Sequence, residues 1–304
     1  MRFRPVAATG MVISAVSLRL NDSHRLTTPQ GWQQLIYDAF EQGINAFEVA
    51  GRQPVMIEGF GQAVQAVERR LLFISLRLGP TLSSAGAVMR DFSPDSLLIQ
   101  LESFLARTGL DYVDAVMLDD PKGDELSPAA LDELKAMRES GRARMLGVSG
   151  ADDAMDAYIS VGAFDLLSMP FSILSGWKER LRLKAGMEKD MALIAYDYFP
   201  ARFHAGAAPK PEKRDKHSRG LDGVGTYAFL DRTNNWTAEE ICLAYALTEP
   251  GLASVQIDAD MGDRIETLAT IPERDLPTGV AAQIEMARFT PVGGGAKAKK
   301  AGRA

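Results

Sequence analysis

Residues 113–121 read VDAVMLDDP, an apolar run that ends in two aspartates and a proline. A short continuous apolar run bounded by a turn signal is typical of a strand that is buried on both faces, as in a parallel sheet. Parallel barrels carry their active sites at the carboxyl ends of such strands. The stretch therefore predicts a buried strand that delivers the side chain of Asp119 to that edge.

Seven further strand-like runs alternate with helical patterns along the chain. With residues 112–119 included, the eight runs cover residues 13–20, 44–50, 70–78, 112–119, 143–150, 164–170, 192–198 and 252–258. Eight strand and helix alternations in about 250 residues are the count of a (β/α)8 TIM barrel. A doubly wound open sheet is the alternative, but no Gly-x-Gly-x-x-Gly follows the first strand. The predicted fold class is α/β, with a TIM barrel as the architecture.

The helix boundaries carry their own chemical signals. Hydroxyl-proline pairs at 28–29, 93–94 and 127–128 place a capping oxygen before the first helical residue and proline at a position whose N–H has no helical partner. Thr237 followed by Glu240 predicts a capping box. Gly43, Gly109 and Gly141 stand where helices end with a positive φ.

Two segments and a tail fall outside the repeat. Residues 1–13 predict an N-terminal β-hairpin around Thr9 and Gly10 that covers the barrel floor. Residues 200–236 form a long loop after strand seven, and its basic centre at 208–220 is typical of a solvated flexible segment. The expected domains are a barrel over residues 1–292 and a flexible basic tail over 293–304.

Composition excludes several classes of function. The net charge of −6 disfavours nucleic-acid binding, which needs a basic surface. No apolar run reaches the length of a membrane span and the first residues lack a signal-peptide core, so we expect a cytoplasmic protein without a membrane partner. Cys242 is the single cysteine, and His24, His204 and His217 lack ligand spacing. We therefore expect no metal site.

The order of several stretches resembles the aldo-keto reductase family. They are the N-terminal hairpin and the sequences EQGINAFEVA, LARTGLDYVDAVMLDDP, GRARMLGVSG and TEPGLASVQI, and the resemblance runs from about residue 2 to residue 289. It implies a (β/α)8 barrel that reduces carbonyls with NAD(P)H at the carboxyl ends of its strands.

All four positions that match the family's catalytic residues carry a different residue here. Glu48 stands for the family aspartate, Gln53 for the tyrosine that protonates the new alkoxide, Arg77 for the lysine and Asp119 for the histidine. An amide neither ionises nor releases a proton near neutral pH. Gln53 therefore cannot replace the family acid.

Two interpretations of these four degenerate catalytic positions remain open. In the first, Glu48 and Arg77 form a bidentate ion pair that Asp119 joins, giving an inert cluster with no catalytic residue in the usual sense. In the second, Asp119 acts as an atypical acid, which burial would favour by raising its proton affinity. We prefer the first, since none of the matched positions carries His, Tyr or Cys.

The resemblance also implies cofactor positions, which are partly kept. Ser149 matches the family serine that binds the nicotinamide amide, and Ser168 stands where the family has glutamine. On strand seven, Asp197 and Tyr198 fall near the pyrophosphate path, where the tyrosine either stacks on the nicotinamide or belongs to the core. Arg19 at the barrel mouth is either a phosphate contact or a surface charge.

The adenosine end allows an electrostatic prediction. In the family this stretch holds a 2′-phosphate, whereas here Asp258, Asp260 and Asp263 surround the place and only Arg264 matches a phosphate-binding residue. A unit charge pair at 4 Å is worth about 4 kcal/mol at an effective dielectric near 20, so carboxylates would repel a 2′-phosphate. NADP(H) is therefore disfavoured, and NAD(H) is compatible because ribose hydroxyls can donate to a carboxylate.

Two functions follow from these observations. The preferred one is a pseudoenzyme that binds NAD(H) and regulates through protein contacts; it resembles the KidO type of oxidoreductase-like cell-division regulator, which implies FtsZ and a histidine kinase as partners. The alternative is an active oxidoreductase that prefers NAD(H) and reduces a small carbonyl with Asp119 as its acid.

Overall fold

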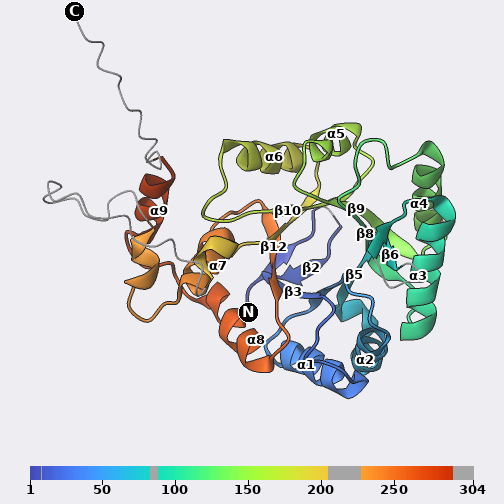
Figure 1. Cartoon of the computed structure of the whole chain (residues 1–304), viewed down its shortest axis with the longest axis horizontal. Helices are drawn as coiled ribbons and strands as arrows, with labels where there is room; N and C mark the ends of the chain where they lie inside the picture. The colour runs from blue at the N-terminus through green and yellow to red at the C-terminus, as the bar shows by residue number, and fades with distance from the viewer. Residues whose placement is uncertain (8, 83–87, 205–226, 290–304) are drawn as a thin grey trace, which may run out of the picture.

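The computed structural model describes residues 1–7, 9–82, 88–204 and 227–289, and it contains a closed parallel barrel. The barrel strands follow the order β3, β4, β5, β8, β9, β10, β11 and β12 before closing on β3. Helices surround the barrel on the outside, as Figure 1 shows. The predicted TIM barrel is confirmed, and the open sheet is excluded because the sheet closes.

The barrel strands match the predicted runs to within a few residues. They are β3 (Val16–Leu20), β4 (Ala46–Val49), β5 (Phe73–Leu78), β8 (Val113–Asp119), β9 (Ala143–Ser149), β10 (Leu166–Pro170), β11 (Ala192–Tyr196) and β12 (Leu252–Asp258). The first predicted strand began too early, because residues 13 and 14 belong to the N-terminal hairpin.

The helices fill the intervals between the strands. They are α1 (Pro29–Glu41), α2 (Pro54–Val64), α3 (Pro94–Thr108), α4 (Pro128–Glu139), α5 (Ala154–Val161), α6 (Trp177–Glu188), α7 (Ala238–Leu247), α8 (Gly262–Ala269) and α9 (Val280–Phe289). Short 3-10 turns are η1 (Arg69–Leu71), η2 (Ala201–Phe203), η3 (Ala228–Asp231) and η4 (Ile271–Glu273).

The chemical signals at the helix ends are confirmed. The side chains of Thr28, Ser93 and Ser127 each accept a hydrogen bond from a backbone N–H in the first turn of α1, α3 and α4. Thr237 and Glu240 form the predicted capping box of α7. The three glycines predicted at helix ends, 43, 109 and 141, have φ values of 79°, 69° and 77°.

The N-terminal hairpin, β1 (Phe3–Pro5) and β2 (Val12–Ser14), covers the barrel floor as predicted. Val6 and Ile13 are buried in an apolar cluster with barrel residues such as Phe73 and Met117. Arg4 donates to the carbonyl oxygens of residues 247, 249 and 252 at 2.5, 3.2 and 2.8 Å. The hairpin is thereby tied to the end of α7 and the start of β12.

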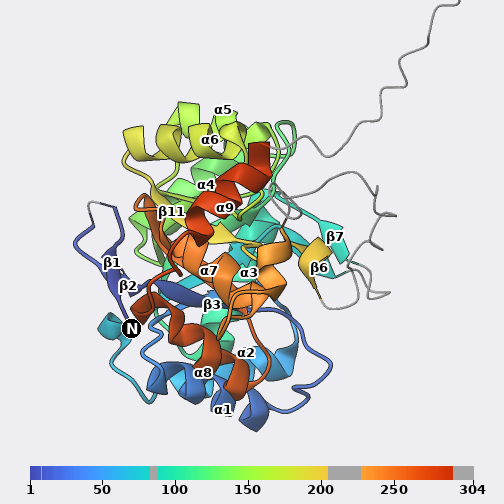
Figure 2. The ribbon, with the colours of Figure 1, turned by 90° about the vertical axis from the view of Figure 1, so that its left-hand side faces the viewer.

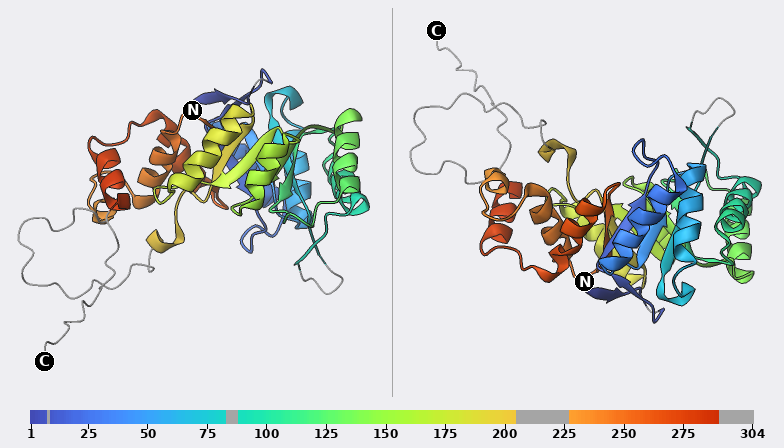
Figure 3. Two further views of the ribbon diagram at one scale, coloured as in Figure 1. Left: turned by 90° about the horizontal axis from the view of Figure 1, so that it is seen from above. Right: turned by 90° about the horizontal axis from the view of Figure 1, so that it is seen from below.

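A second hairpin, β6 (Pro80–Leu82) and β7 (Val88–Arg90), directly follows the carboxyl end of β5 and was not predicted. It lies at the opposite end of the barrel from the β1–β2 hairpin, as the views in Figures 2 and 3 agree. Arg90 holds it in place by donating to both carboxylate oxygens of Glu125 at 3.0 and 2.7 Å. This hairpin therefore stands beside the barrel mouth.

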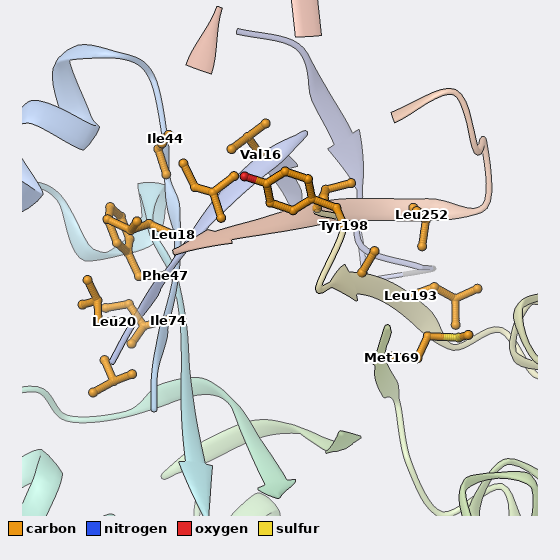
Figure 4. Close-up of a cluster of buried hydrophobic side chains, with 14 of the residues drawn as sticks. Val16, Leu18, Leu20, Ile44, Phe47, Ile74, Met169, Leu193, Tyr198 and Leu252 are labelled. Carbon is orange, nitrogen blue, oxygen red and sulfur yellow. The ribbon is translucent and has the colours of Figure 1, made fainter. Parts of the chain in front are cut away.

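Alternate strand residues face outward and build the main core against the helices. Part of that core is drawn in Figure 4, where Val16, Leu18, Phe47 and Ile74 project from the barrel strands. The other residues face the barrel interior, which is apolar toward the floor. Toward the mouth the interior becomes polar, with the buried residues Ser17, Glu48, Ser75, Ser168, Ser254 and Gln256.

Some predictions concern residues that the structure does not describe. The basic centre of the long loop at 208–220 and the tail at 293–304 lie outside the described residues, so both remain predictions. Among the described residues, no helix combines the length and the apolar character that crossing a bilayer requires.

Candidate functional site

The barrel mouth gathers one polar or aromatic side chain from the carboxyl-terminal part of each strand. The strand register aligns Asp258 with Arg19, Arg19 with Glu48, Asp119 with Ser149, and Ser149 with Ser168. In strand order this rim consists of Arg19, Glu48, Arg77, Asp119, Ser149, Ser168, Tyr196 and Asp258. The register thus brings together six of the residues predicted for catalysis or cofactor binding, and Arg77 joins them through direct contacts.

Arg77 is the centre of this rim. Its Nη2 donates to Glu48 Oε1 at 2.6 Å and to Ser149 Oγ at 3.2 Å, and its Nη1 donates to Asp119 Oδ1 at 2.9 Å. Burial opposes the charge, but Glu48 and Asp119 outweigh it and raise the pKa of Arg77. The ion cluster forms as predicted, except that each carboxylate binds a different guanidinium nitrogen. The expected bidentate contact with Glu48 is wrong, because only Nη2 donates to Glu48 and its Oε2 has no partner among the described residues.

The two carboxylates of the cluster differ in exposure. The side chain of Glu48 is 1% exposed, whereas that of Asp119 is 28% exposed. Glu48 Oε2 and Arg77 Nε have no hydrogen-bond partner among the described residues. Asp119 Oδ1 serves as the acceptor in an ion pair with Arg77. The contact therefore favours the inert interpretation of the four positions.

Gln53 lies apart from this cluster. Its Oε1 accepts from the backbone N–H of Ser23 at 3.2 Å, and its Nε2 donates to the carbonyl of Ser23 at 3.1 Å. Asp22 accepts from the backbone N–H groups of Arg52 and Gln53 at 2.6 and 2.8 Å. The amide predicted to replace the family tyrosine thus joins two loops.

The two predicted nicotinamide contacts are both buried. Ser149 accepts from Arg77 and keeps its own hydroxyl proton for donation. Ser168 is fully buried, and its Oγ has no hydrogen-bond partner among the described residues. A buried hydroxyl without a partner is uncommon in a folded protein and is costly unless something binds it. Both hydroxyls suit the amide group of a nicotinamide.

Arg19 is neither a free phosphate contact nor an exposed charge, the two alternatives that the sequence left open. Its guanidinium donates to both oxygens of Asp258 at 2.8 and 2.7 Å, and Asn21 also donates to Asp258 at 2.6 Å. Asp197 lies 3.8 Å from Arg19 and is largely exposed. Burial opposes the charge of Arg19, but Asp258 raises its pKa. Asp258 is therefore already neutralised within the protein.

Tyr198 belongs to the core, which decides between the two roles considered for it. Figure 4 shows its ring among the apolar side chains near Val16 and Leu252. Its hydroxyl donates to Glu239 at 2.7 Å, and Arg264 donates to the same carboxylate oxygen at 2.7 Å. Tyr198 does not reach the rim, and Arg264 is paired with a carboxylate of α7.

The adenosine end predicted from the sequence forms a pocket of about 390 Å³. Its lining includes Arg19, Asp258, Asp260 and Arg264, together with the loop after β3. Asp260 accepts from Ser23 Oγ at 3.0 Å. Asp263 is exposed and does not line the pocket. Arg19, Arg25 and Arg264 line the pocket, and each has a carboxylate within 4 Å, namely Asp258, Asp260 and Glu239. The pocket therefore offers no excess positive charge to a 2′-phosphate.

The sequence reasoning missed Tyr196. Its ring lies under Arg19 at 5.5 Å, and burial raises its pKa to about 12 despite the opposing charge of Arg77. Counting every second residue from Ile194 would have placed Tyr196 inside the barrel. The same count would place Tyr198 inside too, but Asp197 has a φ of 51° and breaks the alternation. Of the described rim residues, only Tyr196 carries a phenol.

The phenol of Tyr196 is the rim group whose pKa bears on proton transfer. A general acid works best with a pKa near the operating pH, and the pKa of Tyr196 is shifted in the opposite direction. Within the described ranges, no group of three His, Cys, Asp or Glu side chains could hold a metal ion.

Comparisons with known proteins agree with the barrel fold. The model of the Aldo/keto reductase family matches residues 17–288. The NADH-specific methylglyoxal reductase of Escherichia coli (strain K12) is 23% identical over 267 residues, which are 79% of this chain and 78% of the relative.

Two solved structures share the fold. Aldo-keto reductase AKR11C1 from Bacillus halodurans, in its holo form, has a TM-score of 0.75 at 17% identity, covering 94% of this chain and 95% of the other. The glycerol dehydrogenase AKR11B4 from Gluconobacter oxydans has a TM-score of 0.71 at 15% identity, covering 93% and 94%. At these identities the likeness establishes the fold alone.

Proposed function

The chain belongs to the aldo/keto reductase family, and from that premise we propose that it binds NAD(H) without reducing carbonyls by the acid chemistry of that family. The three-way contact of Arg77 with Glu48, Asp119 and Ser149 carries this proposal. A reductase must stabilise and protonate the oxyanion that hydride transfer creates. Here the guanidinium of Arg77, the cation at the centre of the rim, is already bound by the carboxylates of Glu48 and Asp119.

The rim can hold a nicotinamide nucleotide. We expect the hydroxyls of Ser149 and Ser168 to bind the amide, and Tyr196 offers a ring at the mouth. Bound NADH would supply a hydride donor, while these residues would only orient it. The paired charges around Asp258 favour a nucleotide without a 2′-phosphate. The relative named as NADH-specific supports the same preference.

An active reductase is the second candidate, because that relative is named as a methylglyoxal reductase. In this version Asp119, the more exposed carboxylate of the Arg77 cluster, supplies the proton to a small carbonyl substrate. Its geometry as an acceptor from Arg77 weighs against this role.

A binding protein without turnover would act through a partner. The resemblance to KidO-type regulators supplies FtsZ and a histidine kinase as the partners to test, and NADH as the signal. We propose that nucleotide occupancy changes the affinity for such a partner, since a ligand shifts function only through differential binding. Sedimentation of FtsZ polymers with and without NADH tests this directly, and equal co-sedimentation of the chain in both samples would remove the nucleotide from regulation.

One experiment separates the two candidates. The purified, untagged chain is titrated with NADH and with NADPH by fluorescence, and NADH oxidation is then followed on a panel of aldehydes that includes methylglyoxal. We expect NADH to bind at least about tenfold more tightly than NADPH, which corresponds to about 1.4 kcal/mol. We expect no turnover above the rate without protein.

Variants identify the proton source if turnover is found. Loss of reduction in Asp119→Asn with activity kept in Gln53→Ala and Tyr196→Phe would establish the second candidate. Loss in Tyr196→Phe alone would assign the proton to the phenol that the rim retains. Either result would end the proposal of a binding protein, and tight NADPH binding would contradict the charge argument.

A further inference from the structure

A second pocket lies outside the barrel wall, between α2 and α3 and beside the carboxyl end of β5. Its volume is about 300 Å³, and it shares no lining residue with the pocket at Asp258. Figure 1 shows α2 and α3 as neighbours on the outside of the barrel. We call it the α2–α3 pocket, and its occupant does not follow from the nucleotide proposed above.

The charges in the α2–α3 pocket have one sign. Arg52, Arg77 and Arg107 line it, and no Asp or Glu is among its described lining residues. Arg77 is bound by two carboxylates at the rim, but the other two arginines have no carboxylate partner in the described part of the chain. Two guanidinium groups that form no direct ion pair among the described residues therefore line one small volume.

The contacts of Arg52 explain why it stays in place without a counter-ion. Its Nε donates to the carbonyl of Pro80 at 2.7 Å and its Nη1 donates to the carbonyl of Ala50 at 3.1 Å. These neutral acceptors fix the guanidinium without cancelling its charge. Burial lowers the pKa of Arg52, although Asp119 and Asp22 oppose the shift. An anion beside Arg52 would offset the cost of burying its charge, because a nearby opposite charge favours the charged form.

Arg107 approaches the same volume from α3. Ile99, Ser103 and Arg107 are spaced four residues apart, so they share one face of the helix. Long helical side chains lean toward the N-terminus of their helix, which directs Arg107 back along α3 toward Ser103. In the described residues Arg107 makes no side-chain hydrogen bond or ion pair, so its donors are free.

The rest of the wall is mainly apolar. Ile57, Leu76, Leu78, Ile99 and Phe104 supply it. Ile99 is 64% exposed although it stands next to buried residues of the core. An inorganic anion would leave this surface in contact with water, whereas a hydrocarbon chain would cover it. A pocket near the lower end of the usual range for ligand sites also restricts the occupant to a small molecule.

We propose that the α2–α3 pocket binds a small amphipathic carboxylate. The carboxylate takes up the free donors of Arg52 and Arg107, and the hydrocarbon lies against Ile57, Leu76 and Ile99. Guanidinium and carboxylate groups match in charge and in fork geometry. The apolar wall makes the chain, and not only the charge, part of what is recognised.

The test uses octanoate as the probe and the methyl NMR signals of Ile57 and Ile99 as the reporters. We expect octanoate to shift both signals. 1-Octanol lacks the carboxylate and inorganic phosphate lacks the hydrocarbon chain, so each should bind at least about tenfold more weakly than octanoate. The Arg107→Gln variant should weaken octanoate binding by about tenfold or more. Ser103→Trp, which fills the pocket from an exposed helix position, should abolish it.

Arg232→Gln is the matched control, because Arg232 is exposed and lies outside the pocket. It should bind octanoate as the unchanged chain does. Unchanged affinity in both Arg107→Gln and Ser103→Trp would overturn the proposal. So would phosphate that shifts the same signals at the affinity of octanoate, since the pocket would then recognise charge alone. None of these results depends on whether the chain binds NADH.

Discussion

Two buried carboxylates at opposite ends of the barrel differ in how fully their oxygens are hydrogen-bonded. Asp114 lies near the start of β8 and is 0% exposed, and Glu48 lies near the end of β4 and is 1% exposed. Burying a carboxylate costs free energy unless it is paired and hydrogen-bonded. The number of partners that each one has therefore tells what its end of the barrel is built for.

At the floor, both oxygens of Asp114 are satisfied. Oδ2 accepts from Arg69 at 2.7 Å and from the backbone N–H of Ile74 at 2.9 Å, and Oδ1 accepts from Arg144 at 3.4 Å. The two guanidinium groups lie 4.1 and 4.0 Å from the ring of Tyr112. Burial raises the pKa of Asp114 although Arg69 opposes it. The charge itself is costly, and the carboxylate stabilises the fold by serving as an acceptor.

At the mouth, several buried polar atoms have no hydrogen-bond partner among the described residues. Glu48 Oε2, Arg77 Nε, Ser168 Oγ and Gln256 Oε1 are buried and make no hydrogen bond among the described residues. The floor also has one such atom near Asp114, Arg69 Nε, but both oxygens of the Asp114 carboxylate are satisfied, whereas Oε2 of Glu48 is not. The comparison indicates that the floor maintains the barrel and that the mouth is arranged to receive a ligand.

The largest effect should come from the floor. Asp114→Ala leaves Arg69 and the Ile74 N–H without their acceptor, and removing one partner of a buried pair typically costs about 3 to 5 kcal/mol. Urea unfolding should give a loss in this range. Asp111→Ala, at an exposed position just before β8, should change the free energy of unfolding by less than about 0.5 kcal/mol.

Removing the buried carboxylate of the mouth should cost less. In Glu48→Ala, Arg77 keeps its contacts with Asp119 and Ser149, so we expect a loss of about 1 to 2 kcal/mol. The same unfolding measurement applies. A loss as large as that of Asp114→Ala would contradict the distinction between the two ends.

Gln53→Ala should cost about 1 kcal/mol, because it removes two neutral hydrogen bonds to the backbone of Ser23. It should also raise amide exchange at residues 22–25, which these bonds hold. Gln62→Ala on the exposed face of α2 is the control and should leave exchange there unchanged. If Gln53→Ala did not alter exchange, the amide would have no structural role in joining the two loops.

The smallest effect concerns the hairpin beside the mouth and depends on pH. Arg90 and the Lys122 N–H lower the pKa of Glu125 to about 2. A lowered carboxyl pKa contributes stability that is complete above about pH 4.5 and is lost as the pH falls toward 2. The pair is partly exposed, so the contribution is at most about 1 kcal/mol.

Exchange protection of the amides of β7 measures this contribution. Protection should fall as the pH is lowered from about 4.5 toward 2 in the unchanged chain. In Glu125→Gln it should already be low at pH 6 and show little further change. Equal pH dependence in both proteins would mean that another group controls the hairpin.

Much of the fold was predictable because it is encoded locally. The strand at 113–119, the proline-led helix starts and the closing glycines each depend on neighbouring residues alone. The β6–β7 hairpin was missed because its strands are three residues long and its ties, such as Arg90 to Glu125, are distant in sequence. Motif order also located Glu48, Gln53, Arg77 and Asp119 without showing how they interact.

The sequence by itself determined that this chain is a (β/α)8 barrel of the aldo/keto reductase family. It also predicts that the four positions matching the family's catalytic residues hold other residues. Only the tertiary structure showed that Arg77 donates to two carboxylates and that Gln53 hydrogen-bonds to Ser23. It also showed that Tyr196, and not Tyr198, lies at the mouth. The reason is physical: strand and helix periodicity are local. The pairing of charges across a closed barrel depends instead on which strands become neighbours and on a single residue, Asp197, that breaks the alternation.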